Sequence, residues 1–107
     1  MVPEFSLTAH HIPDVHIVAL HGELDIVSSD WLTEALVEGA GSTVVVDLAD
    51  LSFMDCSGID ALVAARNRIL AEGLGQLVLA RPASIARRTL EIVGLEAWIV
   101  DWSPAWA

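Results

Sequence analysis

The sequence predicts an α/β domain with a mixed sheet of four or five strands and helices mainly on one face. Near the start of the chain, apolar and polar residues alternate as in a strand at the edge of a sheet. A β-branched apolar run, Thr43–Leu48, is typical of a strand buried on both faces. Helical spacing and short apolar runs then alternate along the chain, which indicates right-handed crossovers between parallel strands.

The chain opens with a predicted hairpin. Glu4–His10 alternates, Ile12–Asp14 is typical of a turn, and Val15–Leu20 forms the second strand. Later apolar runs predict further strands at Thr43–Leu48, Gln76–Ala80 and Ala97–Val100. We expect Glu4–His10 at an edge of the sheet and Thr43–Leu48 at its centre. The order of elements is therefore β-β-α-β-α-β-α-β.

Capping residues and apolar spacing predict the three helices. Candidate caps for the first helix are Ser28, Ser29 and Asp30. Ser57 and Asp60 resemble a capping box at the start of the second helix. Gly73 is placed to end that helix. Ser84 and Gly94 bound the third. The third helix carries Ile85, Thr89, Ile92 and Val93.

Size and composition predict a single domain over residues 1–107, located in the cytoplasm. Hydrophobic residues make up 54% of the chain and charged residues 19%, as in globular proteins. The apolar runs are too short to span a membrane, and no basic-then-apolar signal segment opens the chain. We expect Trp98 to be partly buried, and Trp102 and Trp106 to cover the core. Ser103-Pro104 is typical of a helix start.

Charge excludes some partners. The chain has 15 acidic and 5 basic residues, for a formal net charge of −10. Such a surface repels phosphate backbones and anionic lipid heads, so we expect no direct binding to nucleic acid and no membrane insertion. The acidity serves either solubility or the binding of a basic partner.

Motifs of catalysis and cofactor binding are missing. The sequence has no glycine-rich phosphate loop and no GxSxG elbow, so we predict no catalytic residues and no cofactor. Four histidines, His10, His11, His16 and His21, cluster near the first two strands. A solvated turn explains them better than a metal site, because no spaced set of Cys or His completes the ligands.

The segment after the central strand is the candidate site. Asp55-Cys56-Ser57-Gly58 joins that strand to the second helix, at the sheet edge where open α/β sheets place their sites. The alternative explanation is an ordinary Ser N-cap, which the local physics alone favours. A phosphate on a residue here would be attracted by the backbone N–H groups at the helix start. It would be repelled by Asp25, Asp55 and Asp60.

The stretch Leu51–Ile59, with Gly22-Glu23-Leu24-Asp25 and Gly94-Leu95, resembles the STAS domain of bacterial anti-sigma factor antagonists. The resemblance runs from about Phe5 to Trp102 and implies a STAS-like fold. It also implies that the chain binds an anti-sigma factor, itself a serine kinase, and so frees a sigma factor for transcription. Carried over residue by residue, it places Asp25, Asp55, Cys56, Ser57 and Gly58 at the partner-binding face.

One departure from the family concerns phosphorylation. The usual phosphoacceptor is the Ser or Thr directly after the aspartate, and this chain has Cys56 there. The family pattern does not make the neighbouring Ser57 the acceptor, although its hydroxyl is a substitute. We therefore expect either constitutive binding or control through the thiol.

Other functions stay open. A STAS module can serve a stressosome scaffold or form the small subunit of a lipid-transport ATPase. From a different class, Cys56 could act as a redox sensor, since a helix N-terminus favours the thiolate while the surrounding carboxylates oppose it.

Overall fold

The structure is a computed structural model that describes residues 5–38, 41 and 43–103. Its strands are β1 (Ser6–Ile12), β2 (Val15–Leu24), β3 (Thr43–Met54), β4 (Gln76–Ala80) and β5 (Ile99–Val100). Its helices are α1 (Ile26–Glu38), α2 (Cys56–Ala71) and α3 (Ser84–Ile92), with a short 3-10 turn at Glu96–Trp98. None of these helices has the length and apolar character needed to span a bilayer.

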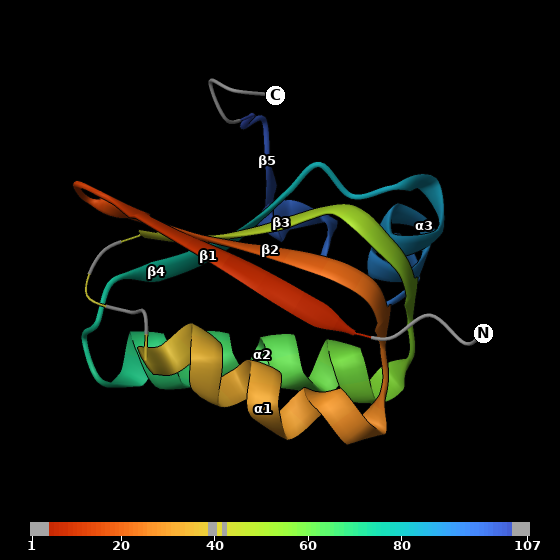
Figure 1. Ribbon diagram of the computed structural model, residues 1–107, viewed down its shortest axis with the longest axis horizontal. Coiled ribbons are helices and arrows are strands. Elements are labelled where there is room, and N and C mark those ends of the chain that lie inside the picture. The colour runs from red at the N-terminus through yellow and green to blue at the C-terminus, as the bar shows by residue number, and fades with distance from the viewer. Residues whose placement is uncertain (1–4, 39–40, 42, 104–107) are drawn as a thin grey trace.

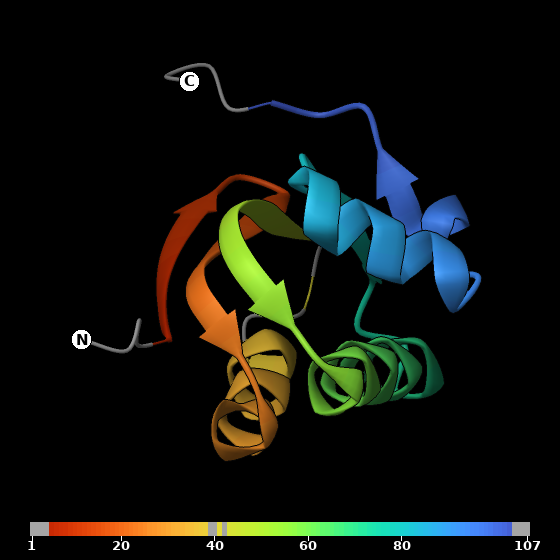
Figure 2. The ribbon, with the colours of Figure 1, turned by 90° about the vertical axis from the view of Figure 1, so that its right-hand side faces the viewer.

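The five strands form one sheet in the order β1-β2-β3-β4-β5. β1 is antiparallel to β2, and the remaining neighbours are parallel. The mixed sheet, the edge position of β1 and the central position of β3 are therefore confirmed. Helices α1 and α2 lie side by side against one face of the sheet (Figure 1), and the view along the strands separates them clearly from α3 (Figure 2).

The main core lies between the sheet and this helix pair, and it also takes Ala86 and Leu90 of α3. It takes the alternate side chains of the strands that point toward the helices, such as Val44 and Val46 of β3, both fully buried. Leu36 of α1 and Leu62 of α2 meet them from the other side. The burial of Val44–Val46 confirms that the β-branched run is a central strand.

The opposite face of the sheet carries a smaller core. Ile17, Val45 and Ala80 are buried there, and the partly buried Trp102 packs against them. The expectation that Trp102 covers the core is confirmed, whereas Trp106 lies outside the described residues. Trp98 is half-buried, as expected, but belongs to the 3-10 turn rather than to the last strand.

An ion pair on this face links the middle of β3 to the residue that follows β4. The guanidinium of Arg81 binds the buried carboxylate of Asp47, with Nε 3.1 Å from Oδ1. The same Oδ1 accepts the backbone N–H of Ala49 at 3.1 Å. This carboxylate therefore fixes the loop after β4 as well as the middle of β3.

Helix α3 faces the core with only part of its apolar surface. Ala86 and Leu90 are buried, while Ile85 and Ile92 are 63% and 75% exposed and Val93 is also exposed. The residues quoted for this helix in the sequence are therefore mostly not the ones that face the core. Ala86 and Leu90 also lie four residues apart, so spacing alone does not choose between the two faces.

The C-terminal ends of the helices match the sequence predictions better than the N-terminal ends do. Gly73 and Gly94 each follow the last helical turn with positive φ, at 66° and 81°, as the predicted stops require. The predicted cap of α3 is displaced by one residue, because Ala83 occupies that position and Ser84 is the first helical residue.

Candidate functional site

Two matching strand-to-helix junctions lie side by side at one edge of the sheet. β2 and β3 run parallel and end opposite each other, with Leu24 paired to Met54. Asp25 follows the first strand and Asp55 the second, and each directly precedes a helix. The backbone N–H of Asp55 donates to the carbonyl of Leu24 at 3.3 Å, which ties the two junctions together.

Asp55 caps helix α2. Its backbone is extended (φ −98°, ψ −172°), and its Oδ1 accepts the N–H of Gly58 at 3.1 Å. The predicted capping box of Ser57 and Asp60 is therefore wrong. β3 continues to Met54, so the helix starts at Cys56 and Ser57 already lies in its first turn.

Asp25 holds the corresponding position before α1. Its carbonyl accepts the N–H groups of Ser28 and Ser29, at 3.2 and 3.1 Å. Its own N–H donates to Ser28 Oγ at 3.2 Å, and that hydroxyl lies 3.3 Å from Asp25 Oδ1. The expected caps at Ser28–Asp30 are wrong, because β2 runs on to Leu24 and the helix begins at Ile26.

Gly58 lies behind this surface rather than on it. The residue is buried, and a Cβ built on it would lie 2.8 Å from Leu24 Cγ and Cδ2 and from Met54 Cγ. Only glycine lets α2 approach the ends of both strands this closely. The expectation that all of Asp55–Gly58 is at the surface is therefore wrong for Gly58.

Cys56 and Ser57 form the accessible part of the junction. Cys56 is exposed, and Ser57 is half-buried. Ser57 lines a groove of about 260 Å³ between α1 and α2, together with Asp30 and Asp60. A negative group added at Ser57 would thus enter a groove that already carries two carboxylates.

Phe53 is an exposed aromatic that the sequence analysis missed as a site residue. It lies beside the junction, near the end of β3, with 45% of its surface exposed. Met54 is buried, so strand alternation could have placed Phe53 on the outside. Ser52 Oγ donates to the carbonyl of Gly22 at 3.0 Å, holding this end of β3 against β2.

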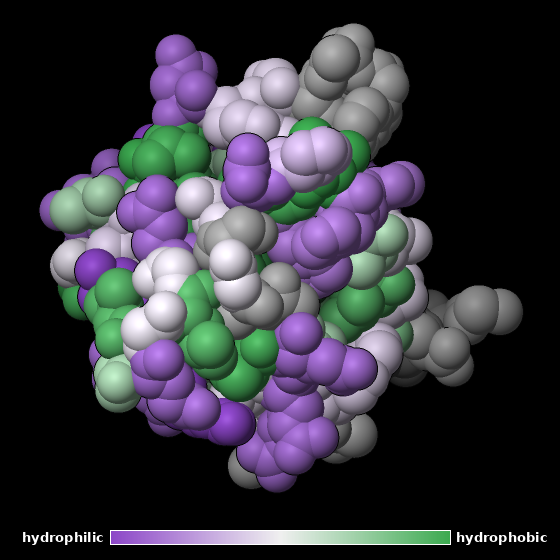
Figure 3. Space-filling model, turned by 90° about the vertical axis from the view of Figure 1, so that its left-hand side faces the viewer, coloured by the Kyte–Doolittle hydropathy of each residue, from purple (hydrophilic) through white to green (hydrophobic). Residues whose placement is uncertain are grey.

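The end of the molecule that holds the β1–β2 turn has a different character. Apolar patches there are separated by hydrophilic residues (Figure 3). The exposed apolar side chains Ile12 and Leu70 come from the ends of β1 and α2. The junction edge, with its aspartates, Phe53 and Cys56, is the better candidate for a specific protein contact.

Comparisons with known proteins identify the family of this chain. A family model of the STAS domain matches residues 6–105. An anti-sigma F factor antagonist from Lysinibacillus sphaericus is 33% identical over 89 residues, covering 79% of this chain and 75% of the relative.

Solved structures match over most of the chain. The anti-sigma factor antagonist SpoIIAA in its unphosphorylated form superposes with a TM-score of 0.78 at 23% identity, covering 92% of this chain and 89% of that one. An anti-sigma factor antagonist from Mycobacterium paratuberculosis gives 0.77 at 20% identity, with 95% and 88% covered. SpoIIAA of Bacillus in its phosphorylated form gives 0.67 at 23% identity, with 92% of each chain covered. These likenesses show the mixed five-stranded α/β fold.

Proposed function

Because this chain belongs to the STAS domain family, we propose that it acts as an anti-sigma factor antagonist. In this role it binds an anti-sigma factor and so releases a sigma factor for transcription. The name of the Lysinibacillus relative and the names of the structural neighbours support the proposal. The observation that carries it is the start of α2, where the exposed Cys56 and the half-buried Ser57 follow the capping Asp55, beside the neighbouring junction at Asp25.

The binding surface, on this proposal, is the edge formed by the two junctions. Asp25, Asp55, Cys56 and Ser57 supply its accessible groups, and the buried Gly58 supports them from behind. Phe53 adds an exposed aromatic of the kind that anchors protein interfaces. The carboxylates favour a partner surface that presents Lys or Arg.

A binding experiment tests this surface. The partner is first captured from the native cell and identified by mass spectrometry as an anti-sigma factor. Calorimetric titration then compares the wild type with Ser57→Glu, which adds charge to the groove between α1 and α2. We expect at least a tenfold loss of affinity, which corresponds to about 1.4 kcal/mol.

Ser84→Glu is the matched control, because Ser84 is an exposed serine in the first turn of α3. It should bind like the wild type, since it makes the same charge change away from the junction. If Ser57→Glu also retains wild-type affinity, the junction is not the interface. Capture of a transport ATPase or a stressosome component in place of an anti-sigma factor would favour those assemblies.

Regulation is the finer part of the proposal. We propose that the partner is a serine kinase and that Cys56, at the family's acceptor position, leaves the chain binding-competent without phosphate. A neutral thiol resembles the unphosphorylated serine in size and charge. Incubation with the partner and ATP, followed by peptide mapping, should leave the wild type unmodified and place one phosphate on residue 56 of Cys56→Ser. A stoichiometric phosphate on Ser57 of the wild type, or an oxidised Cys56 in protein taken from the cell, would contradict constitutive binding.

A further inference from the structure

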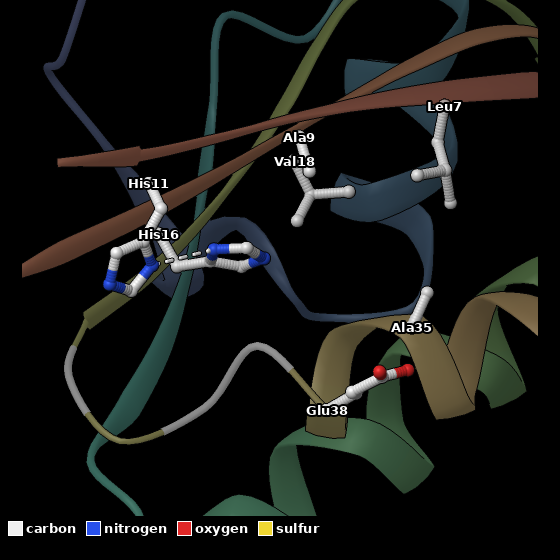
Figure 4. A pocket seen from close by; sticks show the side chains of 7 residues that line it. All are labelled: Leu7, Ala9, His11, His16, Val18, Ala35 and Glu38. Atoms are coloured by element: carbon white, nitrogen blue, oxygen red, sulfur yellow. Dashed lines mark hydrogen bonds between the residues drawn. The ribbon is translucent and has the colours of Figure 1, made fainter.

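Two histidines face each other across the hairpin, away from the junctions. His11 of β1 and His16 of β2 are directly paired in the antiparallel register. Their Nδ1 atoms lie 3.2 Å apart, and their ring centroids are 5.4 Å apart (Figure 4). One ring therefore donates its Nδ1 proton to the unprotonated Nδ1 of the other.

The pair forms one wall of a hollow of about 440 Å³ between the hairpin and α1. Leu7, Ala9, Val18 and Ala35 line its apolar part, and Glu38, the last residue of α1, lies on the opposite wall (Figure 4). Glu38 is exposed, so rotation about its side-chain torsions can bring the carboxylate toward the imidazoles.

The spacing of the two nitrogens matches that of two ligands of one metal ion. A nitrogen ligand lies about 2.0–2.1 Å from Zn²⁺, so two nitrogens in tetrahedral geometry are roughly 3.3–3.4 Å apart. Neighbouring ligands at a right angle are about 2.9 Å apart at the same bond length. The observed 3.2 Å falls between these limits. A metal ion can thus replace the shared proton with little movement of the strands.

The electrostatic setting favours an added cation. Desolvation by partial burial, followed by the neighbouring His11, lowers the pKa of His16, so its ring is neutral and able to bind metal at neutral pH. Glu38 places a carboxylate at the negative end of the α1 dipole, and the last turn of this helix contains no basic residue. Arg68 of α2 lies near Glu38, but its guanidinium pairs with Glu72 at 3.5 Å.

We propose that His11 and His16 bind a divalent transition-metal ion through Nδ1, with Glu38 as a third ligand. The ion enters with water in its remaining positions. The ring that donated from Nδ1 changes tautomer as the ion binds: it gives up its Nδ1 proton and takes a proton from solvent at Nε2, so both ligands are neutral imidazoles. Among the described residues no three such side chains are already gathered as ligands, so Glu38 must change rotamer on binding. The site would clamp the edge strand β1 to the end of α1, at the end of the molecule remote from the junctions. This proposal is independent of the proposed function.

Titration with Ni²⁺ and Zn²⁺ tests the site directly, using full-length protein from which any histidine tag has been removed. We expect calorimetry to show saturable binding of one ion per chain. We also expect NMR to show perturbed Nδ1 resonances at His11 and His16, with His10 and His21 unchanged. Saturable binding without these selective shifts would overturn the proposal, as would the absence of saturable binding up to millimolar metal.

Variants separate the proposed ligands from chance contacts. His11→Ala or His16→Ala should each weaken metal binding more than tenfold. Loss of a residue that only supports a metal ligand already costs about 10–100-fold in affinity, and loss of the ligand itself should cost at least as much. His10→Ala is the matched control, because neighbouring residues of a strand point to opposite faces, and it should bind within about twofold of wild type. Glu38→Gln should weaken binding severalfold, and wild-type affinity in this variant would remove Glu38 from the site. Equal losses in the His10 and His11 variants would overturn the proposal.

Discussion

Gly58→Ala is expected to destabilise the protein, although alanine is the better helix former. The added methyl would lie 2.8 Å from Leu24 and Met54, whose side chains are 0% and 4% exposed. Two of the three close atoms are Cγ atoms near the backbone, so rotation of a side-chain tip cannot relieve the contact. Overpacking of this kind costs about 1–3 kcal/mol. Gaining alanine in a helix returns about 1 kcal/mol at most, so we expect a net loss of about 1 kcal/mol.

Urea unfolding followed by tryptophan fluorescence measures this change, because the chain has four Trp residues. Ala64→Gly supplies the reference, since Ala64 is exposed within the same helix and reports helix propensity alone. That variant should lose about 1 kcal/mol. A Gly58→Ala protein as stable as the wild type, or more stable, would refute the close packing of α2 on the two strand ends.

Three further outcomes are expected from the same unfolding assay. Asp55→Ala should cost about 1 kcal/mol because the cap on α2 is lost, whereas Asp55→Asn should retain most of it; equal losses would contradict a capping role. Asp47→Ala should cost about 2 kcal/mol, less than for a fully buried pair because Arg81 keeps 31% of its side chain exposed; a loss below 0.5 kcal/mol would contradict a structural ion pair. Burial, and then His11, lower the pKa of His16, so stability should fall as the pH drops through the ordinary value of 6.5, where the unfolded chain binds the proton more readily. His16→Gln should flatten this part of the curve, and an unchanged slope would contradict the shift.

The sheet was predictable from the sequence because its signals are local. The alternation in β1 and the two-sided burial of β3 each depend on a single short run of residues. Helix stops were equally local, since Gly73 and Gly94 adopt a positive φ that other residues adopt only with strain.

Helix starts were less predictable because they depend on how far the preceding strand continues. β2 and β3 extend to Leu24 and Met54 through pairing with each other, which no short window reveals. That pairing moves both caps upstream to aspartates, leaving Ser28 and Ser57 inside the first helical turns. The face of α3 was undetermined for a similar reason, because two apolar stripes were available and the path of the chain decides which one is buried.

The same long-range pairing explains why the candidate site could be found without its internal arrangement being foreseen. The aspartates, Cys56 and Ser57 are recognisable in sequence, but the role of Gly58 depends on Leu24, more than 30 residues away. Gly58 packs against both strand ends, and Asp55 donates to the carbonyl of Leu24, so the two junctions share one rigid support. Because this support is rigid, we expect a substitution or modification at the surface to change its charge without changing its shape. We therefore expect a negative charge placed at position 56 or 57 to weaken partner binding because burying it at the interface, beside Asp30 and Asp60, costs free energy, while the capped helix behind it remains folded.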